Sequence, residues 1–331
     1  MVGRAIGIDL GGTQVRVALV DDGGRVLKRA ATRTDVQGGP KAVMAQFRQL
    51  IAEVADDKSL GSISGIGVCA PGPLDSQTGT FIHVPTLPGW EDFPLRDELS
   101  GVLGKPVVVE GDAIAACYGE WRFGAGRGLD HLLYVTVSTG IGGGAISDGR
   151  LLHGRRGMTA HVGHFRMAQQ GPRCSCGAIG CFEAFAAGTA LDKRARQAAL
   201  DHPDSRLAAI ASPTAGDVVE AARQGDAVAL GLIDEEAGYL GEGFTSLIHL
   251  YSPQRVIMGG GVSHGFDLME KRIHAVIRDT AMPSFRDVVV VKAGLGDNAG
   301  LVGAAALVLF DERGTGRGPS PRSGEGGISE K

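Results

Sequence analysis

Short apolar segments that end in glycine-rich turns recur along the chain, with longer amphipathic stretches between them. The segments 5–10 and 15–20 are apolar and predict two strands joined by a tight turn. The turn Asp21-Asp22-Gly23-Gly24 predicts a hairpin into a third strand. Apolar residues at helical spacing predict a helix over 40–55. Further strands are expected at 63–69, 106–110, 132–137, 255–258 and 288–291, and helices at 112–121 and 300–310.

The opening pattern occurs twice, about 130 residues apart. The strand at 5–10 runs into Asp9-Leu10-Gly11-Gly12-Thr13, and the strand at 132–137 runs into Ser138-Thr139-Gly140-Ile141-Gly142-Gly143-Gly144. Each copy continues through a second strand to an Asp-Gly turn. An internal repeat of this kind indicates two similar α/β units. We therefore predict two domains that face each other across a cleft, each contributing one glycine hairpin.

The repeat also predicts where the domains divide. We assign 1–113 and 298–312 to an N-terminal domain, because the apolar helix at 300–310 is placed to pack back on it. The C-terminal domain is predicted to span 114–297 and to be mostly helical up to about His249. Residues 313–331 are rich in glycine, serine, proline and charge, and we predict a disordered tail.

Composition restricts the class of protein without identifying it. A chain of 331 residues with 43% hydrophobic and 21% charged residues is typical of a globular protein of about two domains. The net charge of −4 argues against nucleic acid as a partner. No run of 18 apolar residues predicts a membrane span, and the segment 1–4 lacks the apolar region of a signal peptide. We therefore expect a cytoplasmic protein without a membrane partner.

A compact cysteine and histidine motif lies in the second half, as G-H-x9-C-x-C-G-x-x-G-C-x-E. Its four candidate ligands fall within 18 residues: His164, Cys174, Cys176 and Cys181. Three thiols and one imidazole suit a closed tetrahedral zinc site, and the intervening glycines allow the tight turns that bring the sulfurs together. The alternatives are free thiols or a disulfide, which is rare in the cytosol. We predict structural zinc.

The two glycine hairpins are candidate phosphate sites. Glycine at a strand end exposes backbone N–H groups and lets a phosphate approach closely. Asp9 can hold the water shell of Mg²⁺, and Thr13 and Thr139 supply hydroxyl donors. The pattern is neither a P-loop nor a Rossmann fingerprint. A third run, Gly259-Gly260-Gly261, suits packing beside a nucleotide base, and its alternative is a simple turn from strand to helix.

Asp112 is the candidate catalytic base. It ends a predicted strand and opens a predicted helix, where it can cap the helix and be held ionised by the helix dipole. A carboxylate in that place can accept a proton from an attacking hydroxyl. Phosphoryl transfer needs only a weak, well-placed base, because positioning and charge neutralisation do most of the work. The alternative is an N-cap aspartate without a catalytic role.

With these residues together, the chain resembles sugar kinases of the ROK family (repressors, open reading frames and kinases) over about residues 4–310. The motifs that carry the resemblance are D-L-G-G-T at Asp9, A-P-G-P at Ala70, P-T-L-P-G-W at Pro85, G-D-A at Gly111, S-T-G-I-G-G-G at Ser138, H-V-G-H at His161, C-S-C-G-A-I-G-C-F-E at Cys174 and M-G-G-G-V at Met258. It implies an actin-like, ribonuclease H-like duplicated ATPase fold, with ATP and sugar in the interdomain cleft. It also implies a homodimer or homotetramer.

The resemblance assigns roles to single residues. Asp112 would be the general base for the sugar 6-hydroxyl, and the zinc would order the loop that carries two sugar-binding residues. The ATP loops would comprise Asp9, Gly11, Gly12, Thr13, Thr139, Gly140, Gly142, Gly143, Gly259 and Gly260. The sugar would be bound by Gly72, Thr86, Gly111, Asp112, His161, His164 and Glu183.

Four positions depart from the usual family motifs. His161 replaces the glutamate of E-x-G-H, Gly111 the asparagine of N-D-A, Thr86 the asparagine of P-N-L-x-G-W, and Gln14 a common lysine. The base, the phosphate loops and the metal ligands match, so catalysis is expected to survive. The first three departures affect the choice of sugar.

His161 favours an N-acetylhexosamine. An imidazole N–H can donate to an acetamide carbonyl, which a carboxylate cannot do. Family kinases for N-acetylmannosamine are similar in having H-x-G-H and V-S-T-G, so we predict N-acetylmannosamine. Glucokinase stays open, because A-P-G-P-L-D and P-x-L-P-G-W are similar to glucokinases.

Other functions within the family are also considered. A sugar-responsive repressor would carry an N-terminal helix-turn-helix, whereas the first strand here is predicted from residue 5. A catalytically inactive sugar sensor and a kinase that uses polyphosphate are the remaining alternatives.

Overall fold

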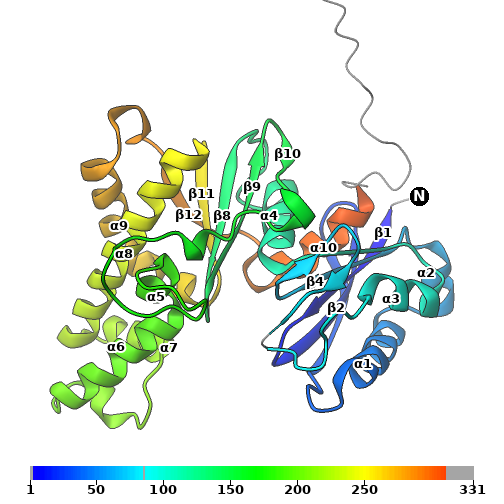
Figure 1. Cartoon of the computed structure of the whole chain (residues 1–331), viewed down its shortest axis with the longest axis horizontal. Helices are drawn as coiled ribbons and strands as arrows, with labels where there is room; N and C mark the ends of the chain where they lie inside the picture. Colours follow the sequence, from blue (N-terminus) through cyan, green and yellow to red (C-terminus); the bar gives the residue numbers. More distant parts are fainter. Residues whose placement is uncertain (1–2, 85, 311–331) are drawn as a thin grey trace, which may run out of the picture.

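A computed structural model of the chain describes residues 3–84 and 86–310. The predicted tail at 313–331 lies outside the described residues. Within the described part, the longer strands form two five-stranded sheets, and helices pack around and between them (Figure 1). None of the described helices combines the length and apolarity needed to cross a membrane.

The two sheets have the same topology. The first has the order β3-β2-β1-β4-β7, and the second has the order β10-β9-β8-β11-β12. In each, the central strand pairs antiparallel with the next strand of its hairpin and parallel with a later strand. The strands are β1 (Arg4–Leu10), β2 (Gln14–Asp21), β3 (Val26–Arg33), β4 (Ile66–Ala70), β7 (Val107–Gly111), β8 (Leu132–Val137), β9 (Ile141–Ser147), β10 (Arg150–Leu151), β11 (Arg255–Gly259) and β12 (Val289–Lys292). The predicted repeat and the α/β fold class are confirmed.

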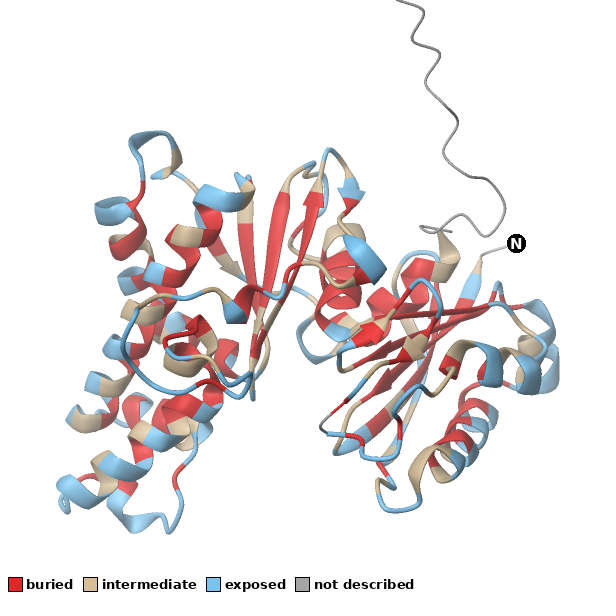
Figure 2. Cartoon of the chain, viewed as in Figure 1, coloured by how far each residue is buried: buried red, intermediate tan, exposed pale blue. Residues whose placement is uncertain are grey.

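Two helices join the halves of the molecule, and both are largely buried (Figure 2). α10 (Ala299–Leu309) packs on β1 and β4, where a Cβ at Gly67 would lie 1.7 Å from the Ala304 carbonyl oxygen. α4 (Asp112–Phe123) packs on β8 and β9 of the other sheet. The two helices touch each other where a Cβ at Gly303 would lie 1.7 Å from the Ala115 carbonyl oxygen. Glycine is required at such contacts because no other residue lets backbones approach so closely.

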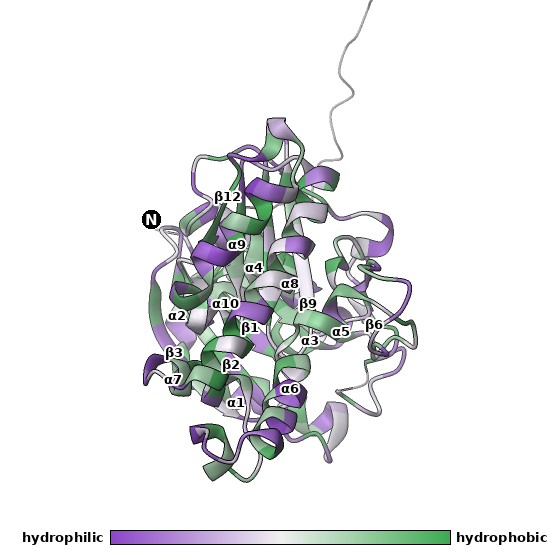
Figure 3. Ribbon diagram, turned by 90° about the vertical axis from the view of Figure 1, so that its left-hand side faces the viewer, coloured by the Kyte–Doolittle hydropathy of each residue, from purple (hydrophilic) through white to green (hydrophobic). Residues whose placement is uncertain are grey.

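The remaining helices cover the outer faces of the two sheets. On the first sheet these are α1 (Gly39–Val54), α2 (Asp57–Ser62) and α3 (Leu95–Leu103). The second unit carries α5 (Phe182–Ala186), α6 (Gly188–Asp201), α7 (Ala215–Arg223), α8 (Ala227–Tyr251) and α9 (Phe266–Thr280). α9 is amphipathic, and Figure 3 shows both hydrophilic and hydrophobic positions on it. It buries Phe266, Met269, Ile273 and Ile277. The 3₁₀ turns are η1 (Arg155–Gly157), η2 (Val162–His164), η3 (Arg206–Ala209), η4 (Gly261–Gly265), η5 (Pro283–Phe285) and η6 (Gly296–Asn298).

Several elements differ from the sequence-based expectation. The strand expected at 63–69 runs as Ile66–Ala70, and the helix expected at 112–121 continues to Phe123. α2, α3 and the small hairpin of β5 (Leu74–Asp75) with β6 (Thr80–Phe81) were not predicted. They are short, and their stability depends on packing rather than on a periodic pattern. The domain boundaries at 113/114 and 297/298 stay a prediction.

Candidate functional site

Two cavities lie next to each other between the two units and share Asp112 and Ala113. The larger has a volume of about 230 Å³ and the smaller of about 70 Å³. The larger is lined by Asp9, Arg16, Asp112, Ala113, Ala116, Tyr134, Thr136, Ser138, Gly260, Gly261, Gly296, Asp297, Ala299 and Gly300. The smaller is lined by Gly72, Pro73, Leu74, Gly111, Asp112, Ala113, Ile114, Gly142, Gly143, Gly157, Met158, Thr159, Ala160 and His161. Asp112 therefore faces both spaces.

Asp112 is the first residue of α4, directly after β7. Gly111 takes the N-cap position with extended backbone, so Asp112 is not the N-cap that the sequence predicted. Its carboxylate accepts the Ala113 N–H at 2.6 Å. Burial raises the pKa of Asp112 to about 6, the Ala113 hydrogen bond opposes that shift, and the charge of Asp9 adds to it. The expectation that the helix dipole sets the charge state was incomplete, because desolvation is the larger effect.

A charged pair borders the larger cavity. Asp9 and Arg16 face each other across β1 and β2, and the guanidinium forms an ion pair with the carboxylate. Arg16 also donates to the Asp297 carbonyl oxygen at 2.9 Å, which ties β2 to η6. Arg16 was not predicted as a site residue. The available signal was an arginine between Val15 and Val17 in a mostly buried strand, where a charge needs a partner.

The first glycine hairpin is held by Thr34, which follows β3. The Thr34 hydroxyl donates to the Gly11 carbonyl oxygen at 2.6 Å, and its N–H donates to the Thr13 carbonyl oxygen at 3.0 Å. Gly12 lies against Thr86, so a Cβ at Gly12 would meet the Thr86 side chain at 3.1 Å. The described residues that line the two cavities do not include this hairpin or Thr86. Thr86 thus contacts the hairpin, and its predicted sugar-binding role stays a prediction.

The second hairpin borders both cavities. Ser138 lines the larger one, Gly142 and Gly143 line the smaller one, and the predicted residues Thr139 and Gly140 form the turn. A Cβ at Gly142 would lie 3.1 Å from the Ala113 Cβ, so this glycine also permits the packing of α4. The structure thus places two of the predicted nucleotide glycines beside the smaller cavity.

The third glycine run lies at the end of β11. Gly260 has a φ of 82°, a backbone conformation that favours glycine. It lines the larger cavity. Gly259 lies beneath the Tyr134 hydroxyl, where a Cβ would come within 2.2 Å. This run therefore combines a cavity wall with a packing contact.

Some of the predicted sugar-binding residues line the smaller cavity, and the others lie outside its lining. Gly72, Gly111 and His161 line the smaller cavity with Asp112, as expected. His164 lies behind His161, with ring centroids 6.4 Å apart. Burial lowers the pKa of His161, and the nearby His164 contributes, which favours the neutral imidazole.

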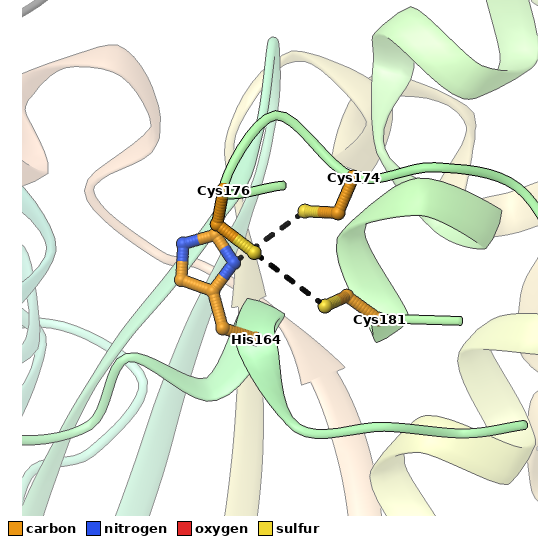
Figure 4. A group of neighbouring side chains, drawn as sticks. All are labelled: His164, Cys174, Cys176 and Cys181. Carbon is orange, nitrogen blue, oxygen red and sulfur yellow. Dashed lines mark hydrogen bonds between the residues drawn. The ribbon is translucent and has the colours of Figure 1, made fainter. Parts of the chain in front are cut away.

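The cysteine and histidine side chains gather as the spacing predicted (Figure 4). The ligand atoms of His164, Cys174, Cys176 and Cys181 all lie within 4.8 Å of one another. The Cys176 and Cys181 sulfurs are 3.7 Å apart, and the Cys174 sulfur lies 3.6 Å from the His164 Nδ1. A zinc–sulfur bond of about 2.3 Å sets tetrahedral ligands about 3.8 Å apart, so the cluster fits such an ion. A disulfide would need sulfurs about 2.05 Å apart.

Glu183 follows the cluster in α5 and does not point into the smaller cavity. Its carboxylate accepts the Ile141 N–H at 3.0 Å and the Ser175 hydroxyl at 2.8 Å. It therefore bridges the cysteine loop and the second hairpin, a contact that the sequence did not predict. The sugar-binding roles predicted for Glu183 and His164 stay predictions.

Comparisons with known proteins agree with this geometry. The sequence profile of the ROK family matches residues 5–310. A glucokinase of Thermotoga maritima is 38% identical over 92% of this chain and 97% of its own length. An N-acetylmannosamine kinase of Yersinia pestis is 31% identical over 92% of this chain and 98% of its own length. A ROK family glucokinase of Streptomyces griseus, solved with glucose and AMPPNP, has 35% identity and a TM-score of 0.79 over 92% of this chain and 99% of that one.

Proposed function

The chain belongs to the ROK family, has the actin-like fold of that family and is an ATP-dependent carbohydrate kinase, and from this premise we propose that it phosphorylates the 6-hydroxyl of glucose, with Asp112 as the general base. The observation that carries the proposal is that Asp112 faces both cavities. A base between the nucleotide and the sugar can receive the proton of the attacking hydroxyl as the phosphoryl group passes.

The larger cavity is assigned to the nucleotide. Gly260 and Gly261 would lie beside the nucleobase of the nucleotide. Ser138 and the hairpin that follows it would face the phosphates. Asp9 lines this cavity with a carboxylate, the oxygen ligand that Mg²⁺ prefers, so the residues present fit that ion. Bound Mg²⁺ would supply neutralisation of the phosphate charge. The guanidinium of Arg16 lies on the same wall and adds a fixed positive charge.

The smaller cavity is assigned to the sugar. Gly72, Gly111 and His161 would surround the ring, and Asp112 would accept a hydrogen bond from its 6-hydroxyl. A pKa of about 6 leaves the Asp112 carboxylate ionised at pH 7 and makes it a better proton acceptor than an exposed aspartate. Positioning of the two reactants supplies most of the remaining rate enhancement.

We assign structural zinc to the cysteine and histidine cluster. His164, Cys174, Cys176 and Cys181 would complete the tetrahedron and leave no open position for a substrate. We expect about one zinc per chain by metal analysis of the purified protein. Removal of the metal by a chelator should lower the melting temperature, and metal-free protein with an unchanged melting temperature would contradict the assignment.

A second candidate substrate is N-acetylmannosamine, favoured by His161. The neutral imidazole at the wall of the smaller cavity can donate to an acetamide carbonyl. We put glucose first because glucokinase relatives reach 34–38% identity, against 31% for the N-acetylmannosamine kinase.

A coupled ADP-release assay on a panel of sugars decides between the two. We expect kcat/KM for glucose to exceed that for N-acetylmannosamine at least tenfold, about 1.4 kcal/mol of transition-state preference. The reverse ratio would establish the acetamide sugar, and His161→Glu should then shift the preference toward glucose. Binding without turnover for every sugar would favour the inactive sensor. The homodimer or homotetramer and the cytoplasmic location stay predictions.

A further inference from the structure

We propose that the segment 181–189, which begins at the last ligand of the cysteine cluster, fixes the peptide groups of the second hairpin for the phosphates of the nucleotide. In this proposal Glu183 and Thr189 are positioning residues for the nucleotide. The proposal rests on the proposed function in one respect, that nucleotide phosphates bind at this hairpin. It does not depend on which sugar is phosphorylated.

Three hydrogen bonds connect this segment to consecutive parts of the hairpin. The Gly188 N–H donates to the Ser138 carbonyl oxygen at 2.7 Å, and the Thr189 hydroxyl donates to the Thr139 carbonyl oxygen at 2.8 Å. The Ile141 N–H donates to the Glu183 carboxylate at 3.0 Å. Every peptide group from Ser138 to Ile141 is therefore oriented, since the Gly140 carbonyl oxygen accepts the Ser138 N–H at 2.9 Å within the turn.

These bonds decide which way the N–H groups of the turn point. In a trans peptide the carbonyl and the N–H of one unit point in opposite directions. Because the Ser138 and Thr139 carbonyls point toward α6, the N–H groups of Thr139 and Gly140 point away from α6, to the open side of the hairpin. Two successive N–H groups on one side form the kind of concavity that binds an anion.

The turn does not determine this conformation by itself. It has one internal hydrogen bond, and Gly140 permits backbone conformations that other residues avoid. A flipped peptide would present a carbonyl oxygen to the phosphate and repel it. The contacts from 181–189 select the binding conformation, and Gly140 lies so close that a Cβ would meet the Glu183 carboxylate at 2.5 Å.

The segment itself is anchored on two sides. Phe182 is fully buried between Phe165 and Phe244, with ring centroids 5.3 and 6.2 Å away. At the other end of α5, Arg194 donates to the Phe185 carbonyl oxygen at 2.5 Å and forms an ion pair with Glu236, which is fully buried in α8. The core of the second unit and the cysteine cluster thus hold the side chains that orient the hairpin.

Thr189→Val tests the proposal directly, because it removes the hydroxyl and keeps the shape of an exposed side chain. We expect calorimetric titration to show about fivefold weaker AMPPNP binding, the size of one lost hydrogen bond, with the KM for sugar unchanged. Thr189→Ser should restore binding. The matched control is Thr214→Val, which removes a helix-capping hydroxyl from α7 far along the chain and should leave AMPPNP affinity unchanged. Unaltered AMPPNP affinity in Thr189→Val would overturn the proposal.

Glu183→Ala tests the contact of the carboxylate with the hairpin. Orientation of the hairpin predicts an increase in the KM for ATP of about tenfold, in addition to any change in the KM for sugar. An unchanged KM for ATP would overturn the positioning role. Zinc content is measured on the same sample, since Glu183 also lies 3.5 Å from the Cys174 sulfur. Failure of the glucose assignment would change only the sugar panel, whereas failure of this inference would leave AMPPNP binding insensitive to both variants.

Discussion

The two glycine hairpins occupy equivalent places in two sheets of the same topology, yet different chemistry surrounds them. In the first sheet, Leu10 and Val15 form the cross-strand pair that closes the hairpin. The next pair along the strands is Asp9 and Arg16, and both residues are charged. In the second sheet the corresponding pair is Thr136 and Gly142. The first half therefore brings charge to the larger cavity, and the second half brings hydroxyl groups and glycines.

The helices that cover the sheets explain this difference. α4 packs on β9 so closely that a Cβ at Gly144 would lie 2.5 Å from the Cys117 Cβ, and side chains are excluded from that face. In the first sheet α10 makes its close contact at Gly7 and Gly67, away from Arg16. The helix therefore leaves space for the Arg16 side chain. A duplicated topology thus fixes the position of a hairpin, while helix packing decides which side chains can surround it.

The largest expected effect comes from Asp112, which opens the helix between the two halves. Asp112→Asn keeps the shape and removes the proton acceptor, so kcat should fall about 10³-fold. Glucose binding, measured by titration, should change less than threefold. Because the buried carboxylate is costly when ionised, this variant should be more stable than the wild type at pH 8, by up to about 3 kcal/mol.

A modest loss of activity with Asp112→Asn would remove the general base from the mechanism. A fall in the melting temperature would instead indicate that the carboxylate supports the fold through its contact with Ala113.

Binding of the nucleotide phosphates by the first sheet is expected to depend on Arg16. Arg16→Ala removes a cation from the nucleotide cavity and leaves Asp9 facing the phosphates, so the KM for ATP should rise about 30-fold. Arg16→Lys should recover part of this loss, because lysine keeps the charge without the planar fork. Arg25→Ala is the matched control, since Arg25 pairs with Asp21 in the exposed turn at the other end of β2. Equal effects of the two alanine variants would show that Arg16 acts through stability.

The sequence predicted what depends on local pattern, and missed what depends on distant contacts. The repeat, the cysteine cluster and the position of Asp112 follow from fixed spacings and from strands that end in glycine. The Arg16 contact with Asp297 joins residues 281 positions apart, and the Glu183 contact with Ile141 joins residues 42 apart. No local pattern specifies such pairs, because tertiary packing decides which polar groups meet. The contact of Thr86 with Gly12 was missed for the same reason.

The pH dependence of activity gives a third, smaller effect. Because the pKa of Asp112 is raised to about 6, kcat/KM should fall about tenfold between pH 7 and pH 5 as the base is protonated. The stability should change in the opposite sense. A carboxyl with a raised pKa in the folded state favours folding at low pH and disfavours it as the pH passes 6.

Melting temperatures separate this titration from that of ATP, whose terminal phosphate also titrates near pH 6. The excess stability of Asp112→Asn over the wild type should be small at pH 4.5 and should grow up to pH 7.5. A difference that does not vary with pH would assign the acid limb of the activity to the nucleotide.

The smallest expected effect compares the anchors of the two hairpins. Thr34 corresponds to Thr189 in holding a turn carbonyl through its hydroxyl, which donates to the Gly11 carbonyl oxygen at 2.6 Å. Thr34→Val keeps the backbone bond to Thr13, so we expect only about threefold weaker AMPPNP binding, against fivefold for Thr189→Val. The first hairpin should depend less on its turn because Arg16, and Mg²⁺ bound at Asp9, would carry the interaction of this sheet with the phosphates. A larger loss with Thr34→Val than with Thr189→Val would reverse the comparison and make the first hairpin the principal phosphate site.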